Sequence, residues 1–319
     1  MFLHTLSNAE VLAELDKRVY GHRDAKKILI NAVNRSQMIY YYKIVKGNTD
    51  FSLKPMNVLL WGKSGSGKSM LAEAIQAIVG FPAYRFDATQ FTPTGGKGRY
   101  DAEAIIKVIR EMIKCCLNMP NSRFFSKEGV QHQTFIVVEE VDKLAASFDS
   151  SGKWNEQIQA GLLTLMESKD DLEGVSWIMT GAFTGMKTDE NAPNSIGFAK
   201  QDVKDKQEPD WDAVITKFGL LPELVGRITN VVRLDKLSLD DYERIFWEML
   251  YPKALDDIAL FGVDKLPLTQ EKIDQLLQKS FKSDQGIRFM QKELAKITMD
   301  IEFYSEQRAP HEALYGKGV

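Results

Sequence analysis

The residues Gly62–Ser69 (GKSGSGKS) have the types and spacing of a phosphate-binding loop, GxxxxGK[ST]. Glycines let consecutive backbone N–H groups turn toward one phosphate, and the start of a following helix adds positive potential there. Lys68 is expected to reach the β- and γ-phosphates of a nucleotide, and the Ser69 hydroxyl to ligate Mg²⁺. The residues predicted to contact nucleotide in this loop are Gly62, Ser64, Gly65, Ser66, Gly67, Lys68 and Ser69.

The segments on either side of the loop decide between a binding site and a chance Gly/Ser-rich turn. The apolar run Asn57–Trp61 predicts a strand directly before the loop, and Lys68–Val79 has a helical pattern directly after it. A phosphate cradle needs a strand, a loop and a helix in this order. The sequence therefore predicts a site for ATP or ADP with Mg²⁺.

Two carboxylates at the end of a second apolar run complete this predicted site. Phe135–Val138 reads as a buried strand, and Glu139 and Glu140 follow it directly. We expect Glu139 to hold the magnesium through water and Glu140 to act as the catalytic base that polarises the attacking water. Most such ATPases carry Asp at the first position, and the extra methylene of Glu moves the carboxylate by about 1.5 Å. The alternative is an acidic strand end that faces solvent.

The elements that must position these residues alternate along the chain. Consecutive apolar residues separated by helices indicate a parallel sheet covered on both faces, which is an α/β fold. The predicted strands are Asn57–Trp61, Tyr84–Phe86, Phe135–Val138, Trp177–Thr180 and Thr229–Leu234. The predicted helices of this part are Ser7–Val19, with a capping box from Ser7 to Glu10, then Asp24–Lys46, Lys68–Val79, Asp101–Cys116 and Asn155–Glu167.

Beyond about residue 236 the strand signal stops, and only helical patterns remain. They predict helices at Leu239–Leu250, Pro252–Leu260, Gln270–Phe281 and Ile287–Tyr304. We therefore expect an α/β domain with its N-terminal helices over residues 1–236, a small all-helical lid domain over 237–308 and a polar tail over 309–319.

Composition excludes several other classes of protein. Of the 319 residues 44% are hydrophobic and 27% charged, which is enough apolar material for packed cores. No apolar run approaches the roughly 20 residues of a membrane span, and no signal peptide is recognisable, so we expect a cytoplasmic protein. A net charge of −3 gives no global attraction to nucleic acid. Cys115 and Cys116 are adjacent in a helical pattern and are expected to be buried free thiols.

Five segments, together with the phosphate loop, resemble the ClpX/HslU family of AAA+ ATPases from about residue 18 to about residue 305. These segments are VYGHRDAKKIL (19–29), VVEEVDKL (137–144), TGAF (180–183), KFGLLPELVGRI (217–228) and QGIRFMQKEL (285–294). The resemblance implies an AAA+ core with a helical lid and a homo-oligomeric, hexameric ring. It covers the motor region of the family, without a zinc-binding N-terminal domain. The host it implies is a bacterium or a phage-infected cell.

The resemblance also implies a role for each matching residue. Val19 and Tyr20 would line the adenine pocket, and Thr180 would help to orient the attacking water. Arg227 would reach from one subunit into the nucleotide site of its neighbour. Arg288 would reach the phosphates of its own subunit and couple hydrolysis to a hinge.

Two loops concern partners. The segment NSIGFAKQDVKDK resembles a loop that docks on the ClpP peptidase, with Ile196, Gly197 and Phe198 as the anchor. The alternative is that Ile196 and Phe198 pack on their own domain. In the predicted substrate loop, Gly96 and Lys97 stand where the family carries an aromatic and an aliphatic residue. Arg99 adds a second cation, and Tyr100 is the only aromatic residue near it.

Three functions remain open at this point. The first is an ATP-dependent ring motor that unfolds or remodels protein substrates and delivers them to a ClpP-like peptidase. The second is a nucleic-acid motor or loader in which Lys97 and Arg99 track a phosphate backbone, which the acidic balance disfavours. The third is a non-processive switch, in which nucleotide state changes assembly or partner choice.

Overall fold

The computed structural model describes residues 6–48, 50–91, 101–119, 126–145, 152–168, 172–184, 210–234, 236–283 and 285–304. The chain divides into two compact units. One unit comprises Met1–Gly62 with Lys68–Leu234, and the other comprises Lys63–Gly67 with Asp235–Val319. The predicted substrate loop, the predicted peptidase loop and the tail after Tyr304 lie outside the described residues.

The first unit is built on a five-stranded sheet in the order β2-β3-β4-β1-β5. All neighbouring strands run parallel. The strands are β1 (Val58–Trp61), β2 (Ala83–Asp87), β3 (Phe135–Glu139), β4 (Ser176–Gly181) and β5 (Asn230–Arg233). The predicted five-stranded parallel α/β sheet is therefore confirmed.

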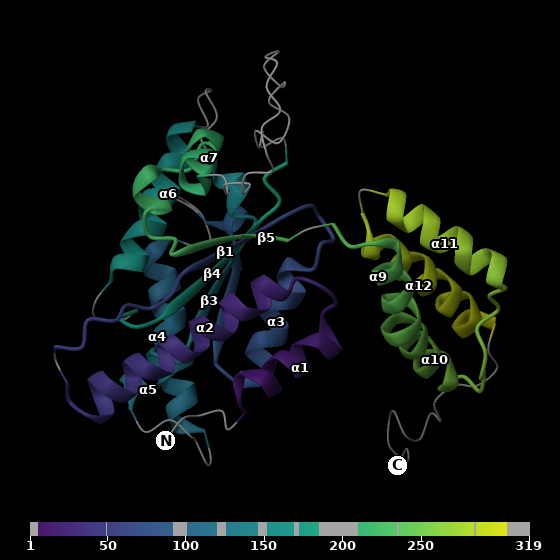
Figure 1. Ribbon diagram of the computed structural model, residues 1–319, viewed down its shortest axis with the longest axis horizontal. Helices are drawn as coiled ribbons and strands as arrows, with labels where there is room; N and C mark the ends of the chain where they lie inside the picture. Colours follow the sequence, from purple (N-terminus) through teal and green to yellow (C-terminus); the bar gives the residue numbers. More distant parts are fainter. Residues whose placement is uncertain are drawn as a thin grey trace, which may run out of the picture. The chain divides into compact units, whose positions relative to one another are not determined.

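Helices cover both faces of the sheet, as Figure 1 shows. On one face, α1 (Asn8–Arg18), α2 (Arg23–Ile39) and α3 (Lys68–Val79) pack against the strands, and their core includes Leu60 and Val137. On the other face, α4 (Ala102–Asn118), α5 (Lys127–Gln131), α6 (Gly152–Glu167), α7 (Trp211–Phe218) and α8 (Pro222–Val225) contribute to a core with Leu59 and Val138. Successive strand residues thus alternate between two apolar cores, which explains the continuous apolar runs in the sequence.

Most predicted helices begin and end within a few residues of the bounds of the observed helices. The capping box of α1 is confirmed, because Ser7 Oγ accepts from Glu10 N at 3.3 Å and Glu10 Oε2 accepts from Ser7 N at 2.6 Å. The predicted helix Asp24–Lys46 is α2 followed by a π-helical turn at Tyr40–Val45. The helices α5, α7 and α8 had no counterpart in the sequence prediction. At four to eight residues they are too short to show a clear helical period.

The second unit is helical after residue 236. It contains α9 (Leu239–Ile245), a π-helical turn at Phe246–Leu250, α10 (Tyr251–Ala259), α11 (Gln270–Lys282) and α12 (Ile287–Tyr304). These helices pack on one another around a small set of buried side chains, which include Phe246, Ile258, Leu277, Met290 and Leu294. The predicted helical part that follows the α/β core is confirmed.

Three observations concern the expectations from composition. Cys116 is buried but Cys115 is exposed, so the expectation of two buried thiols is wrong for Cys115. Neighbouring helix positions point in different directions, and only one of them meets the core. In the parts of the chain that the structure describes, no helix is long and apolar enough to span a membrane. The same parts contain no cluster of His, Cys, Asp and Glu side chains arranged to hold a metal.

Candidate functional site

The predicted phosphate loop joins β1 to α3 as the motif requires. β1 ends at Trp61, and α3 begins at Lys68. Gly65 has φ +77° and Gly67 has φ +91°, a left-handed conformation that a side chain would strain. The loop therefore takes a backbone path that only glycine follows easily, and it leads directly into the positive end of a helix.

Two polar side chains of this loop fit a phosphate ligand. Lys68 Nζ donates to the backbone oxygen of Gly62 at 2.7 Å, so its ammonium group is folded back over the loop. Ser66 Oγ is buried and has no hydrogen-bond partner among the described residues. A buried hydroxyl without a partner is costly unless a ligand or water satisfies it. The donor set, an ammonium group, hydroxyls and loop amides, is the chemistry that binds phosphate.

The two carboxylates at the end of β3 differ in exposure and in backbone conformation. Glu139 is the last residue of the strand and is partly buried, whereas Glu140 is exposed. Glu140 has φ +56°, a left-handed conformation that costs a non-glycine residue roughly 1–2 kcal/mol. Such strain persists only where surrounding contacts enforce it, and it is common at functional sites. The backbone therefore turns abruptly between the two glutamates, and one side chain is partly buried while the other is exposed to solvent.

The turn after Glu140 is fixed to the neighbouring strand β4. Asp142 is buried, and its Oδ1 accepts from the backbone N of Ala182 at 3.0 Å. Thr180, at the end of β4, pairs with Leu60 of β1 and is 2% exposed. The N–H of Gly62 donates to the backbone oxygen of Gly181 at 3.3 Å. The structure thus places Thr180, Glu139 and the start of the phosphate loop along the carboxyl edge of one sheet.

Val19 and Tyr20, predicted for the adenine pocket, are both buried where α1 ends. The segment that follows is held by Lys26 of α2, which is 1% exposed. Its Nζ donates to the backbone oxygen of Val19 at 2.5 Å and pairs with Asp16 at 2.6 Å. Sequence reasoning did not single out Lys26. The available signal was a lysine on the apolar face of an amphipathic helix, next to Ala25 and Leu29.

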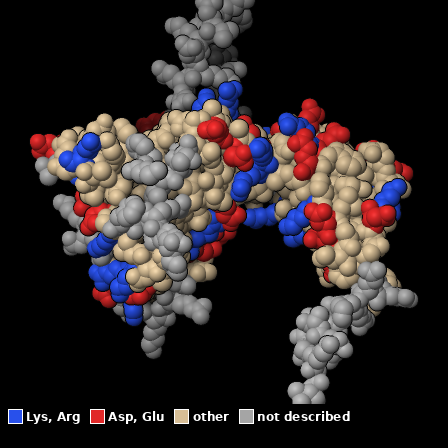
Figure 2. Space-filling model, turned by 90° about the horizontal axis from the view of Figure 1, so that it is seen from below, with Lys and Arg blue, Asp and Glu red and all other residues tan. Residues whose placement is uncertain are grey.

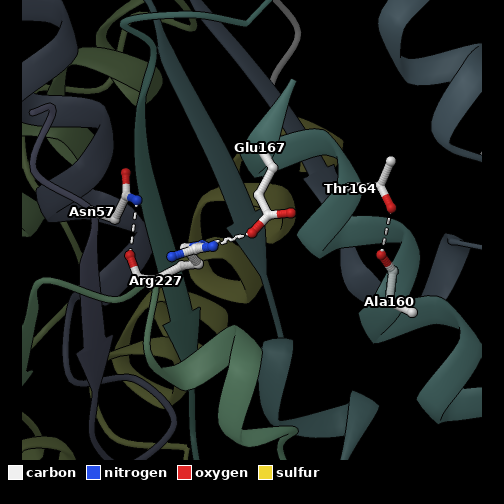
Figure 3. Close-up of polar contacts among 5 residues, drawn as sticks. All are labelled: Asn57, Ala160, Thr164, Glu167 and Arg227. Atoms are coloured by element: carbon white, nitrogen blue, oxygen red, sulfur yellow. Dashed lines mark hydrogen bonds and ion pairs between the residues drawn. The ribbon is translucent and has the colours of Figure 1, made fainter. Parts of the chain in front are cut away.

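Arg227 lies at the opposite, amino edge of the sheet (Figure 3). Its guanidinium is paired with Glu167 at the end of α6, with Nε 3.0 Å from Glu167 Oε1 and a second contact through Nη2. Its backbone oxygen accepts from Asn57 Nδ2 at 2.9 Å, directly before β1. Asn57 and Glu167 were not predicted, because their partner is distant in the sequence.

Asn57 connects three segments at that edge. Its Oδ1 accepts from the backbone N of Trp177 at 3.1 Å, and its backbone N donates to Thr229 Oγ1 at 3.1 Å. Its backbone oxygen accepts from the N–H groups of Thr229 and Asn230. The short segment that carries Arg227 is therefore fixed to β1 and β4 by hydrogen bonds, and Glu167 directs its side chain.

Arg288 lies at the start of α12 and is exposed. Within the unit formed by Lys63–Gly67 and Asp235–Val319, its Nη1 lies 3.4 Å from Ser64 Oγ. The substrate-loop residues Gly96, Lys97, Arg99 and Tyr100 lie outside the described residues. The same holds for the peptidase-loop residues Ile196, Gly197 and Phe198.

Comparison with known proteins agrees with this geometry. Residues 58–190 match the model of the ATPase family associated with various cellular activities (AAA). This range begins at β1 and includes the phosphate loop, both glutamates and Thr180.

Similar proteins extend the likeness to nearly the whole chain. The ATP-dependent Clp protease ATP-binding subunit ClpX 2 of Wolinella succinogenes is 27% identical over 94% of this chain and 78% of its own length. The ClpX subunit of Borrelia duttonii is 28% identical over 92% of this chain and 73% of its own length. The ClpX subunit of Treponema denticola is also 28% identical, over 92% of this chain and 76% of its own length.

Proposed function

We propose that this chain, which is a ClpX-like ATPase of the AAA+ class, works in a ring of identical subunits to unfold or remodel proteins. One observation carries the proposal. The phosphate loop follows β1, whereas Arg227 is bonded to Asn57, which precedes β1. The four residues of this strand separate the two by about 13 Å. Arg227 therefore faces away from its own nucleotide site and is available to that of a neighbouring subunit.

Within one subunit we propose the roles that the family resemblance implies. Lys68 and the loop amides bind the phosphates, and the Ser69 hydroxyl with Glu139 would hold Mg²⁺, Glu139 through water. Bound Mg²⁺ supplies charge neutralisation at the phosphate oxygens. Glu140, which is exposed, takes up the proton of the attacking water, and Thr180 orients that water. Val19 and Tyr20 bind the adenine, and Arg288 contacts the phosphates in cis.

A net charge of −3 favours protein over nucleic acid as the substrate. On the face shown in Figure 2, acidic and basic side chains are interspersed over the described residues. A nucleic-acid motor would need a continuous basic track. The similar proteins are named as subunits of a Clp protease, and this supports a ClpP-like peptidase as the partner of Ile196, Gly197 and Phe198. Phe198→Ala is expected to leave ATP turnover unchanged and to abolish co-sedimentation with such a peptidase.

The ring mechanism is tested by two variants that are each expected to be inactive. Glu140→Gln keeps Arg227 but loses the catalytic base of its own site. Arg227→Ala keeps Glu140 as the base but loses the positive charge that it would supply to the neighbouring site. A trans arginine contributes on the order of 10³–10⁵ in rate in other NTPases, so each variant alone is expected to lose nearly all turnover. In a random equal mixture, about one interface in four combines an intact base with an intact arginine, and some turnover should return.

The control for this experiment is Arg244→Ala, which removes another exposed arginine of an ion pair, on α9. It is expected to leave turnover unchanged. Turnover at the parent rate in Arg227→Ala would refute the trans role of this arginine. A mixture that stays inactive, although both variants bind ATP and assemble, would refute the shared site.

A further inference from the structure

A partly buried cation lies beside the glutamate that departs from the usual ATPase pattern. Arg85 of β2 places Nη1 at 3.7 Å from Glu139 Oε1. The same Nη1 also forms a salt bridge with Glu73 of α3. The Arg85 and Glu139 side chains are each 25% exposed. No motif in the sequence pointed to Arg85.

The strand register explains why these side chains meet. β2 and β3 pair in parallel with Arg85 opposite Val137 and Asp87 opposite Glu139. Arg85 and Glu139 are thus diagonal neighbours on one face of the sheet, a separation that a long side chain spans. Val137 belongs to the core that contains Leu71 and Ile75 of α3. Arg85 and Glu139 therefore lie on the face that α3 covers, and α3 begins with Lys68 and Ser69.

Arg85 consequently joins the two elements that would hold the metal. Its bond to Glu73 fixes it to α3, four residues after Ser69, and its charge attracts the carboxylate at the end of β3. Glu139 Oε1 and Arg85 Nη2 are both buried and have no hydrogen-bond partner among the described residues. Each retains bonding capacity, so a small movement converts the 3.7 Å ion pair into a direct hydrogen bond.

We propose that Arg85 is a positioning residue for the magnesium site, and this inference rests on the function proposed above. A glutamate has one more rotatable bond than the aspartate usually found here, so its carboxylate has more freedom to move away from the metal. Arg85 holds Oε1 from the side of β2 and leaves the second oxygen for the water shell of Mg²⁺. Glu139 and Arg85 therefore act as a pair. The glutamate without the arginine would not hold the magnesium as the usual aspartate does.

The test measures metal-dependent nucleotide binding rather than turnover alone. A fluorescent ADP analogue is titrated into the full chain in excess Mg²⁺ and again in EDTA. The dissociation constant in EDTA divided by that in Mg²⁺ measures the metal contribution. Arg85→Met keeps much of the chain length and removes the charge. We expect it to reduce the ratio by about tenfold, the lower end of what loss of an outer-sphere partner costs a metal site. Binding in EDTA is expected to be unchanged.

Three further variants separate positioning from a general structural effect. Arg85→Lys keeps the positive charge, and its ratio is expected to lie between those of Arg85→Met and the parent. In the Glu139→Asp background the shorter carboxylate no longer reaches Arg85, so Arg85→Met is expected to change the ratio little. Lys114→Met removes an exposed ion pair on α4 and serves as the matched control with no effect.

The outcomes distinguish the inference from the function on which it rests. If the parent chain binds the nucleotide neither in Mg²⁺ nor in EDTA, the proposed nucleotide site itself is wrong. If it binds equally well in both, there is no metal contribution for Arg85 to support, and the inference is refuted while the nucleotide site stands. If the parent shows the difference and Arg85→Met retains it, the role of Arg85 is refuted. A larger ratio in Arg85→Met than in the parent would also refute it, because Arg85 would then compete with Mg²⁺ for Glu139. An equal loss in the Glu139→Asp background would show that Arg85 does not act through Glu139.

Discussion

The two edges of the central sheet are built in different ways. At the carboxyl edge, the residues that would bind nucleotide come from two contiguous stretches, Gly62–Ser69 and Glu139–Glu140. At the amino edge, Arg227 is held by Asn57 and Glu167, which are 170 and 60 residues away in the sequence. Local sequence therefore determines the first edge, and tertiary packing determines the second.

The energetics of the two edges differ as well. The carboxyl edge contains left-handed backbone at the non-glycine residue Glu140, and the loop after β1 carries a buried hydroxyl of Ser66 without a partner among the described residues. These features cost stability, and a ligand relieves part of that cost. At the amino edge, the backbone N–H groups of Thr229 and Asn230 and the side chain of Asn57 are all hydrogen-bonded. Substitutions at the carboxyl edge should therefore affect function more than folding, and those at the amino edge should affect both.

The largest effect is expected at Lys68. Lys68→Ala removes a cation that would contact two phosphates, and hydrogen bonds to charged groups contribute about 1.5–3 kcal/mol each. Nucleotide affinity is expected to fall at least about a hundredfold. Thermal unfolding without nucleotide should change little, because the hydrogen bond from Nζ to the Gly62 oxygen is only partly buried. Titration with a fluorescent ATP analogue, with Lys63→Ala as the control inside the loop, measures this. A large loss of stability in Lys68→Ala would contradict the contrast between the edges.

An intermediate effect is expected at Glu167. Glu167→Gln keeps the length of the side chain but weakens its hold on the guanidinium of Arg227, which is 52% exposed. We expect kcat to fall by about tenfold while KM and ATP affinity stay the same, because a misplaced group lowers the stability of the transition state only. Stability should change by less than about 1 kcal/mol, as for other exposed ion pairs.

The matched control for Glu167 lies on the same helix. Thr164 is exposed, and its hydroxyl donates to the backbone oxygen of Ala160, one turn earlier (Figure 3). Thr164→Ala is expected to leave kcat unchanged. If Glu167→Gln instead hydrolyses ATP faster than the parent, Glu167 holds Arg227 away from the neighbouring site, and its role is inhibitory.

A stability effect is expected at Asn57. Asn57→Ala leaves the backbone N of Trp177 and the backbone oxygen of Arg227 without their side-chain partner. The N–H of Trp177 is partly buried, and an unpaired buried group costs about 1–3 kcal/mol, so the urea midpoint is expected to fall by up to this amount. The exposed oxygen of Arg227 is hydrated instead and adds little. Asn34→Ala, which removes one exposed hydrogen bond to Asn8, should stay within about 0.5 kcal/mol of the parent. Equal midpoints for the two variants would show that the amino edge is not fixed by Asn57.

The same contrast explains how much the sequence predicted. The five strands were recognisable because both faces of the sheet are buried, and α3 and α12 were predicted at their observed bounds. The phosphate loop was recognisable because one backbone path requires glycine at fixed positions. Asn57, Arg85 and Glu167 were missed, because each acts through a partner that only folding brings close. The roles of the substrate loop and the peptidase loop remain predictions.

The smallest effect concerns pH and again separates the edges. His132 lies at the amino edge, between α5 and β3, and is 4% exposed. Burial lowers its pKa, and Lys43 lowers it further, while Glu173, a backbone hydrogen bond to Gly174 and Glu128 raise it and offset only part of this change. The unfolded chain therefore binds a proton at His132 more readily than the folded chain does.

The sign of the pH effect follows from this difference in proton binding. As pH falls through the unfolded pKa of about 6.5, the unfolded state gains a proton first, and stability is lost until the lower folded pKa is passed. The urea midpoint of the parent is expected to fall between pH 7.5 and 5.5, and His132→Gln should flatten that dependence. Nucleotide affinity should not follow this titration, because no residue of the predicted site contributes to the pKa of His132. An equally steep pH dependence in His132→Gln would locate the titrating group elsewhere and remove this distinction between the two edges.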